Sequence, residues 1–527
     1  MTRIAILFPL IAVFTALAPI TAFSQTTGNN SVNVYNILNY GAIGDAKTLN
    51  TSAIQKAFDD CHQHGGGVVE IPTGSFVTGT LHLYSNMNLH FGPGAALVGS
   101  TDNKDYGYQK DYGFGGLGAG NKTGILVAHN EQNISITGFG TIKGNGTSFM
   151  YMDSLQYGMD LDRKYTRQKN DYMDPKFGRE DGPVLWKGTY EERPGVMVMF
   201  SSCKNVTVSQ VSFEESPNWT LAFLNSEHIN VNSIAIRNNL LIPNSDGVDF
   251  YDSKNIVIAN CDIHAGDDAI AVISSSNLSA ANCVLQSRSS GIRIGYNVWT
   301  TNSSGNLLFD NITIYDSNRG IGIFQRQKGD MENMMFSNIV INTRLHSGQW
   351  WGHGEPIHIS SVPGLGSKET GAIRHVHFSN IIASSEAGIV IYATTKDLIN
   401  DISFDNISLT IKNGPLTKSY GGNIDLRPTN DLSLGIFSHN TPALYSNYTS
   451  NLNIRNFTVS WDKGLPSWFT HAVEVENFEL LTVDGLHEAT SNNKNPVLYL
   501  HKGNGANVKE VTSKLGGKKL VLTNNKD

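Results

Sequence analysis

The chain has 527 residues, a net charge of −7 at pH 7 and 16% charged residues. This balance excludes the basic surface that binding to nucleic acid or to an anionic membrane requires. The four cysteines lack the CxxC spacing of zinc sites, so we expect stacked interior thiols rather than a disulfide framework or a metal site.

The N-terminal segment is short and apolar. It carries Arg3 near its start and ends on the small-residue pattern Ala22-Phe23-Ser24. This pattern predicts a secretory signal peptide over residues 1–24. No later apolar run is long enough to span a bilayer. We therefore expect residues 25–527 to form one exported domain, in the periplasm, at the cell surface or outside the cell.

A short amphipathic helix is expected near the start of this domain. Its apolar residues follow the capping candidates Asn50 and Thr51, and three glycines from Gly65 end the run. Residues 101–195 lack sustained periodicity, which suggests long loops. The apolar residues at helical spacing are Ile54, Ala57, Phe58 and Cys61.

A strand-like motif with a turn asparagine then recurs from Asn232 to Asn406. The interval is 22 to 29 residues, apart from one gap of 42. Such a repeat predicts an all-β parallel solenoid in which each coil buries its apolar side chains against the next, with the helix plugging the first coil. Asparagine tolerates left-handed backbone angles and can bond to the asparagine of the next coil. We expect buried ladder positions even at the two glycosylation sequons, Asn311 and Asn406.

Three aspartates fall one repeat apart in this region. N-S-D-G-V-D begins at Asn244, and G-D-D follows 21 residues after Asp246, so Asp246, Asp267 and Asp268 share one face of the stack. Crowded carboxylates raise one another's pKa, which lets one remain an acid while another remains a base. We expect separations near the ~6.5–9.5 Å of inverting glycosidases.

Four segments follow one another along the chain: R-P-G-V-M-V-M-F from Arg193, S-P-N-W-T from Ser216, P-N-S-D-G-V-D from Pro243 and A-G-D-D-A-I-A-V from Ala265. In this order they resemble glycoside hydrolase family 28, the polygalacturonase and rhamnogalacturonan hydrolase group. The resemblance implies a right-handed parallel β-helix and an inverting mechanism. It implies that Asp267 is the general acid and that Asp246 and Asp268 hold and activate the attacking water, with Asn244 binding substrate beside them.

The chain departs from the family at two cationic positions. Ser290 stands where the family has the histidine of G-H-G, and Gly322-Ile323-Phe324 stands where it has R-I-K, which binds a uronate carboxylate. A standard endo-polygalacturonase is therefore not expected. Arg293, Arg319 and Arg326 are candidates to replace the lost cations, because arginine pairs bidentately with carboxylates.

The gap of 42 residues contains a candidate sugar-binding excursion. Trp350 and Trp351 can stack on sugar faces or anchor the loop, and we favour sugar binding, with Trp351 as the contact. Glu355 is a candidate to bind hydroxyls or to orient water in place of the histidine. His353 and His358 lack a matching acidic or Cys set, so no metal site is expected.

The sequence therefore predicts a secreted, monomeric, cofactor-free hydrolase of acidic polysaccharides or oligosaccharides. Loops at 101–195 and 343–372 that closed one end of the cleft would favour exo-action. Two alternatives remain open. One is a polysaccharide lyase, with the aspartates binding Ca²⁺ and Arg293 as the base. The other is a non-catalytic glycan-binding solenoid.

Overall fold

The computed structural model describes residues 33–112, 121–155, 163–172, 182–189, 192–296, 302–348, 350–490 and 493–524. The expected signal peptide lies outside these residues. From Asn33 onward the chain forms one compact unit. Across the described ranges, no helix is both long and apolar enough to cross a membrane.

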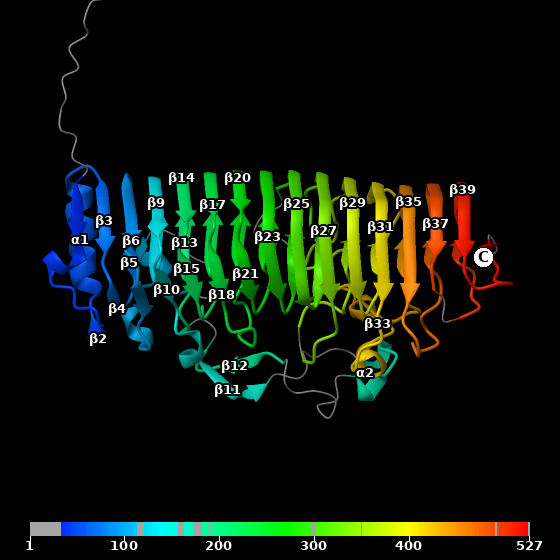
Figure 1. The fold of residues 1–527 in the computed structure, drawn as a ribbon, viewed down its shortest axis with the longest axis horizontal. Coiled ribbons are helices and arrows are strands. Elements are labelled where there is room, and N and C mark those ends of the chain that lie inside the picture. The colour runs from blue at the N-terminus through cyan, green and yellow to red at the C-terminus, as the bar shows by residue number, and fades with distance from the viewer. Residues whose placement is uncertain are drawn as a thin grey trace, which may run out of the picture. The chain divides into compact units, whose positions relative to one another are not determined.

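The unit is a right-handed parallel β-helix, as expected (Figure 1). Each coil contributes one short strand to a 14-stranded parallel sheet of the described chain. These strands are β5 (Leu81–His82), β8 (Leu126–His129), β13 (Val198–Ser201), β16 (Leu221–Leu224), β19 (Val248–Tyr251), β22 (Ile270–Ile273), β24 (Ser290–Gly295), β26 (Arg319–Gln325), β28 (Ile357–Ser361), β30 (Ile389–Ala393), β34 (Leu444–Asn447), β36 (Val473–Glu476), β38 (Leu498–His501) and β40 (Val521–Asn524).

The rest of each coil enters a second parallel sheet, 22-stranded in the described chain. Up to β21 a coil supplies two short strands, and from β23 onward it supplies one long strand. The strands are β1 (Val34–Asn36), β2 (Asp45–Leu49), β3 (Gly67–Ile71), β4 (Gly74–Thr78), β6 (Met87–Phe91), β7 (Ala95–Gly99), β9 (Gln132–Gly138), β10 (Thr141–Lys143), β14 (Lys204–Ser209), β15 (Ser212–Glu214), β17 (Glu227–Asn232), β18 (Ala235–Arg237), β20 (Lys254–Ala259), β21 (Asp262–Ala265), β23 (Ser276–Ser287), β25 (Ser304–Ser317), β27 (Met331–Thr343), β29 (Ile373–Ser385), β31 (Ile399–Ile411), β35 (Thr449–Trp461), β37 (Glu479–Glu488) and β39 (Asn504–Ser513).

The core lies between the sheets. The strand register stacks side chains of successive coils on one another there. Identical side chains of successive coils pair, because parallel strands repeat at about 4.8 Å. Phe309 and Phe336 are register partners whose rings stack with centroids 5.0 Å apart, and Phe378 continues the stack at 4.9 Å. All four cysteines are buried free thiols, which confirms that prediction.

The asparagine ladder forms, but it is exposed. Asn282 donates to Asn260 at 3.2 Å, Asn311 donates to Asn282 at 2.8 Å, and these residues have positive φ. The expectation that Asn311 and Asn406 are buried is wrong. At a left-handed corner the side chain lies along the outer edge of the stack, where its bonds run only to neighbouring coils.

The predicted capping helix is α1 (Thr51–Gln63), which buries the four apolar residues expected to face the core. Its cap differs from the expectation. The Asn50 side chain accepts from the backbone N–H of Ile43 at 2.7 Å and makes no bond to the helix. The helix packs against β1, β3 and β5 and covers the first coil.

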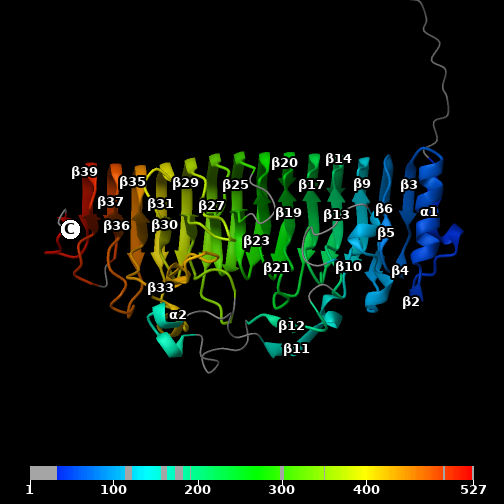
Figure 2. The same ribbon diagram turned by 180° about the vertical axis from the view of Figure 1, so that it is seen from behind.

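Residues 101–195 do not form only loops, because β8, β9 and β10 within them complete a coil. The later part of this range leaves the stack. There β11 (Met150–Leu155) pairs antiparallel with β12 (Val184–Trp186). Residues 163–172 lie beside α2 (Thr417–Tyr420), β32 (Asn423–Asp425) and β33 (Ile436–Ser438), which both views show (Figures 1 and 2).

Two polar residues hold this segment, which we call the strap (residues 163–172). Arg167 donates through Nε to the carbonyl of Gly422 at 3.1 Å and through Nη2 to that of His439 at 2.8 Å. Asn423 donates to the Gln168 side chain at 2.9 Å. The strap therefore fixes a loop far away in the sequence, residues 421–440, and that loop borders the site described next.

Candidate active site

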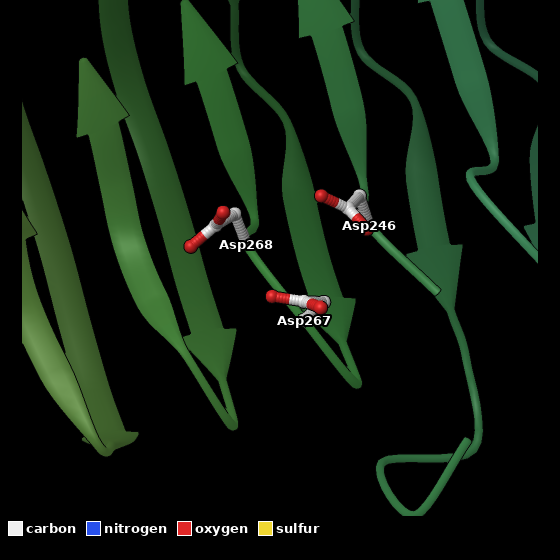
Figure 3. A group of neighbouring side chains, drawn as sticks. All are labelled: Asp246, Asp267 and Asp268. Atoms are coloured by element: carbon white, nitrogen blue, oxygen red, sulfur yellow. The ribbon is translucent and has the colours of Figure 1, made fainter. Parts of the chain in front are cut away.

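The three predicted aspartates meet at the turns that enter two neighbouring strands. Asp246 precedes β19, and Asp267 and Asp268 precede β22, with their side chains directed toward a common space (Figure 3). One carboxyl oxygen of each lies within 4.8 Å of the others. All three are buried. The predicted juxtaposition is therefore present.

Two glycines let these turns approach closely. A Cβ on Gly247 would lie 2.4 Å from the carbonyl oxygen of Ala269, and one on Gly266 would lie 2.3 Å from that of Ile242. Both distances are too short for any side chain. The glycines of N-S-D-G and G-D-D are thus needed to stack one acidic turn on the next.

Hydrogen bonds orient the carboxyls. Asn244 donates through its side chain to Asp267 Oδ2 at 3.3 Å and accepts from Arg193 at 3.1 Å. The backbone N–H of Ser290 donates to Asp268 Oδ1 at 3.0 Å. Asn244 also lines the pocket. It can therefore contact a substrate, as predicted, as well as orient Asp267.

The aspartates differ in their electrostatic surroundings. Burial and the neighbouring charge of Asp268 raise the pKa of Asp267 to about 7. Burial and the charge of Asp267 also raise the pKa of Asp246. Asp267 is therefore suited to carry a proton near neutral pH. The nearest oxygens are closer together than the ~6.5–9.5 Å expected for inverting carboxyls, because the two turns stack in direct contact.

A pocket opens over the aspartates and continues toward later coils. Trp219 borders it beside the aspartates, and Trp351, Arg319 and Arg427 border it further along. Arg319 and Arg427 therefore line a different part of the cavity from the aspartates. This arrangement suits a ligand that reacts at one end and carries negative charge at the other.

Arg427 was not anticipated from the sequence. It lies two residues after Asp425, which accepts from its Nε at 2.8 Å and from its Nη2 at 2.6 Å. The carbonyl of Trp350 accepts from the same Nη2 at 3.1 Å. Arg427 belongs to no repeat motif, so the only local signal was the acidic residue two positions before it.

The structure brings Arg319 to the pocket and leaves Arg326 outside its lining. Arg326 is fully buried and donates to the carbonyls of Ser360 at 3.1 Å and Leu426 at 3.0 Å. Burial lowers its pKa to about 9. Predicting Arg326 as a substrate ligand is therefore wrong, because its side chain turns into the protein and ties two segments together.

In the excursion around residues 350–355, some residues line the pocket and others are buried behind it. Trp351 lines the pocket, as predicted, whereas Trp350 is buried and anchors the loop. Glu355 is buried beneath the pocket, where it accepts from Arg319 at 3.5 Å and from the backbone N–H of His353 at 2.6 Å. Glu355 therefore does not bind substrate hydroxyls directly, because its buried carboxylate pairs with Arg319 and positions that side chain.

The guanidinium of Arg293 lies among the aspartates. Its Nε donates to Asp268, and its Nη1 donates to the carbonyl of Gly295 at 2.7 Å. The prediction that it clamps a substrate carboxylate is not supported by these contacts. In the described chain, Asp246, Asp267 and Asp268 are the one group with the spacing to hold a cation, and Arg293 already supplies positive charge there.

Comparison with known proteins agrees with this geometry. Residues 181–419 match the model of the family described as Glycosyl hydrolases family 28. Over 261 residues the chain is 33% identical to an exo-poly-alpha-D-galacturonosidase of Dickeya chrysanthemi, covering 46% of this chain and 42% of that protein. A probable polygalacturonase of Vitis vinifera is 29% identical over 244 residues, covering 45% of this chain and 43% of that protein. The chain thus spans less than half the length of these two curated relatives.

The fold also has a counterpart among solved structures. An exopolygalacturonase from Thermotoga maritima superposes with a TM-score of 0.52 at 20% identity, over 72% of this chain and 87% of that one. This likeness concerns the β-helix alone. The family match, in contrast, spans both acidic turns, so residues 181–419 are similar to glycoside hydrolase family 28 in the part of the chain that carries the three aspartates.

Proposed function

We propose that the protein is an exported, monomeric glycoside hydrolase that cleaves uronate-containing polysaccharides or oligosaccharides with inversion. The observation that carries the proposal is the buried group of Asp246, Asp267 and Asp268, in which Asp267 has a pKa of about 7. An acid that is protonated near neutral pH beside potential bases is the equipment that glycoside hydrolysis needs.

In the proposed step, Asp267 donates its proton to the glycosidic oxygen as the bond from that oxygen to the anomeric carbon breaks. Asp246 and Asp268 hold a water molecule on the opposite face of the sugar. The water oxygen bonds to the anomeric carbon, and its proton passes to one of these two carboxylates. The new hydroxyl therefore has the configuration opposite to that of the cleaved bond.

The other end of the pocket supports an anionic substrate. Arg319 and Arg427 line it, and Trp351 offers an aromatic face for a sugar ring. The side chain of Arg319 is held by Glu355 and that of Arg427 by Asp425. Because a uronate presents a carboxylate beside an apolar ring face, this combination favours a pectin-like chain over a neutral glycan.

Exo-action is part of the proposal. The excursion that carries Trp351 and the loop that carries Arg427 both border the pocket, and the strap holds the second of them. Loops crowded at one end restrict how far a polymer can continue past the scissile bond. The Dickeya chrysanthemi relative is named as an exo-acting enzyme, which agrees with this mode.

The test is the release of reducing ends from polygalacturonate, rhamnogalacturonan, their oligosaccharides and neutral glycans. Proton NMR of the first product formed reports the anomeric configuration. We expect release from uronate chains, monomers or short products from the outset, and inversion. Asp267→Asn should abolish turnover. Asp262→Asn is the matched control, because Asp262 lies on β21 of the 22-stranded sheet.

The same assay separates the alternatives. Unsaturated, ultraviolet-absorbing products that a chelator removes would establish the lyase. Tight binding without new reducing ends would establish the glycan-binding solenoid. Release from neutral glycans alone would overturn the anionic substrate while leaving the hydrolase.

A further inference from the structure

The guanidinium of Arg293 is held mainly by this chain. Its Nε donates to Asp268, its Nη1 donates to the Gly295 carbonyl at 2.7 Å, and its Nη2 lies 4.0 Å from an oxygen of Asp246 and 4.0 Å from one of Asp249. The residue is 8% exposed and lines the pocket. Because Nε and Nη1 already donate within the chain, Arg293 does not offer a substrate carboxylate a free pair of donors.

Strand register explains how Arg293 reaches these groups. On β24 it is the register partner of Ala271 on β22, which in turn pairs with Asp249 on β19. The small side chain of Ala271 leaves room for the arginine to lie back across one coil. A larger residue at 271 would fill that space and push the guanidinium away from the aspartates.

Asp249, the last residue of N-S-D-G-V-D, is a fourth carboxyl beside the three aspartates. It is fully buried, and neither of its oxygens has a hydrogen-bond partner among the described residues. Burial raises its pKa. An oxygen of Asp249 lies 4.0 Å from Arg293 Nη2, whereas Asp268 accepts directly from Arg293 Nε, so Asp268 is the aspartate that Arg293 orients.

Ser290 shows what the site lacks. It stands where the family has a histidine, its backbone N–H donates to Asp268, and its hydroxyl has no partner in the described part of the chain. No titratable cation comes from this position. The groups around Arg293 are the four aspartates, the Tyr296 ring 5.6 Å from its guanidinium carbon, and, in the same pocket, Arg319.

We propose that Arg293 is a positioning residue that donates to Asp268 and holds it aimed as a base, in place of the missing histidine. This inference rests on the proposed hydrolase function. Because arginine stays protonated at every working pH, the site gains a fixed positive charge where a histidine would titrate. The cation belongs to the catalytic carboxylates, and recognition of the substrate anion is left to Arg319 and Arg427.

The experiment compares Arg293→Ala and Arg293→Lys with the parent on oligogalacturonides, as kcat and KM from pH 4 to 9. We expect Arg293→Ala to lower kcat about 10²-fold while KM changes less than about threefold. Added guanidinium ion should restore part of kcat.

Two further variants keep the test decisive. Arg293→Lys retains the charge and should lose less activity than Arg293→Ala, and it stands in if the alanine variant fails to fold. Arg288→Lys is the matched control, because Arg288 lies on the same coil and pairs with Asp316 at 3.3 Å, away from the pocket. Its kinetics should equal those of the parent.

The outcomes are distinct. A raised KM with unchanged kcat would overturn the inference and return Arg293 to substrate binding. Loss of activity without rescue by guanidinium would also overturn it, in favour of a merely structural role. A parent inactive on all uronate substrates would instead mean that the proposed function fails.

Discussion

The guanidinium carbon of Arg427 lies 5.0 Å from the centre of the Trp351 ring. Asp425 holds the arginine through two side-chain bonds, and Arg427 Nη1 has no hydrogen-bond partner within the described residues. A stacked, preoriented arginine loses little entropy on binding an anion. The two residues come from separate loops and together form one wall of the pocket.

Replacing Arg427 should therefore weaken binding of an anionic substrate. We expect Arg427→Ala to raise KM for oligogalacturonides about 10- to 100-fold, with a smaller change in kcat. Arg427→Lys should fall between parent and alanine, because lysine lacks the planar fork. Arg374→Ala is the control, since Arg374 pairs with Asp330 at 2.7 Å on the outer sheet. Equal effects of Arg427→Ala on neutral and acidic substrates would contradict the assignment.

The pH dependence of activity should reflect Asp267. A general acid must be protonated, and burial with the charge of Asp268 raises the pKa of Asp267 to about 7. The value of kcat/KM should therefore fall as pH rises above about 7, approaching tenfold per pH unit. Initial rates at substrate concentrations far below KM measure this limb. A rate that stays level to pH 9 would remove Asp267 from the role of acid.

Glu474, outside the pocket, should make stability depend on pH. Burial and the charge of Glu476 raise the pKa of Glu474 from 4.5 to about 7. The folded state then holds a proton that the unfolded state releases, so stability is lost as pH rises from about 4.5 through 7. Glu474→Gln should be more stable than the parent at pH 8, by up to ~3 kcal/mol, and equal to it at pH 4.

Denaturant unfolding at the two pH values measures this difference. Asp249→Asn should show the same sign, because burial raises the pKa of that carboxyl as well. Glu332→Gln, on β27, is the control for the exchange of a glutamate for an amide away from this pair. A Glu474→Gln variant that is less stable at pH 8 than at pH 4, relative to the parent, would show that the glutamate is ionised in the fold.

Loosening the strap should weaken substrate binding from a distance. Arg167 donates to the carbonyls of Gly422 and His439, and its guanidinium carbon lies 5.1 Å from the centre of the Trp468 ring. Arg167→Ala should cost about 1–3 kcal/mol of stability and raise KM, because the loop that carries Arg427 loses its support. Limited proteolysis and steady-state kinetics check both effects.

Arg163→Ala serves as the comparison for the strap. Its Nη1 donates within the segment, to the carbonyl of Asn170 at 3.4 Å. It should leave KM unchanged. If Arg167→Ala lowers stability but leaves KM and the pattern of products unchanged, the strap supports the fold without shaping the pocket.

The repeat in the sequence determined most of the architecture. Each coil obeys the same alternation of inward apolar and outward polar residues, so the parallel stack, the buried thiols and the capping helix could all be predicted locally. Asp246 and Asp267 could be placed together for the same reason, because residues one repeat apart become neighbours. The position of Asn311 was predicted wrongly: the ladder forms, but its corner faces solvent, so the side chain is exposed.

Only the tertiary structure decided how the cations are used. Arg326 turns inward, Arg319 enters the pocket with Glu355 behind it, and Arg293 joins the aspartates. The sequence predicts the face of a strand on which an arginine lies. It does not predict the partner, because the long side chain pairs with whichever acceptor the neighbouring coils place within reach. Arg427 comes from a loop outside the repeat, and it reaches the site because the loops of distant coils pack together there.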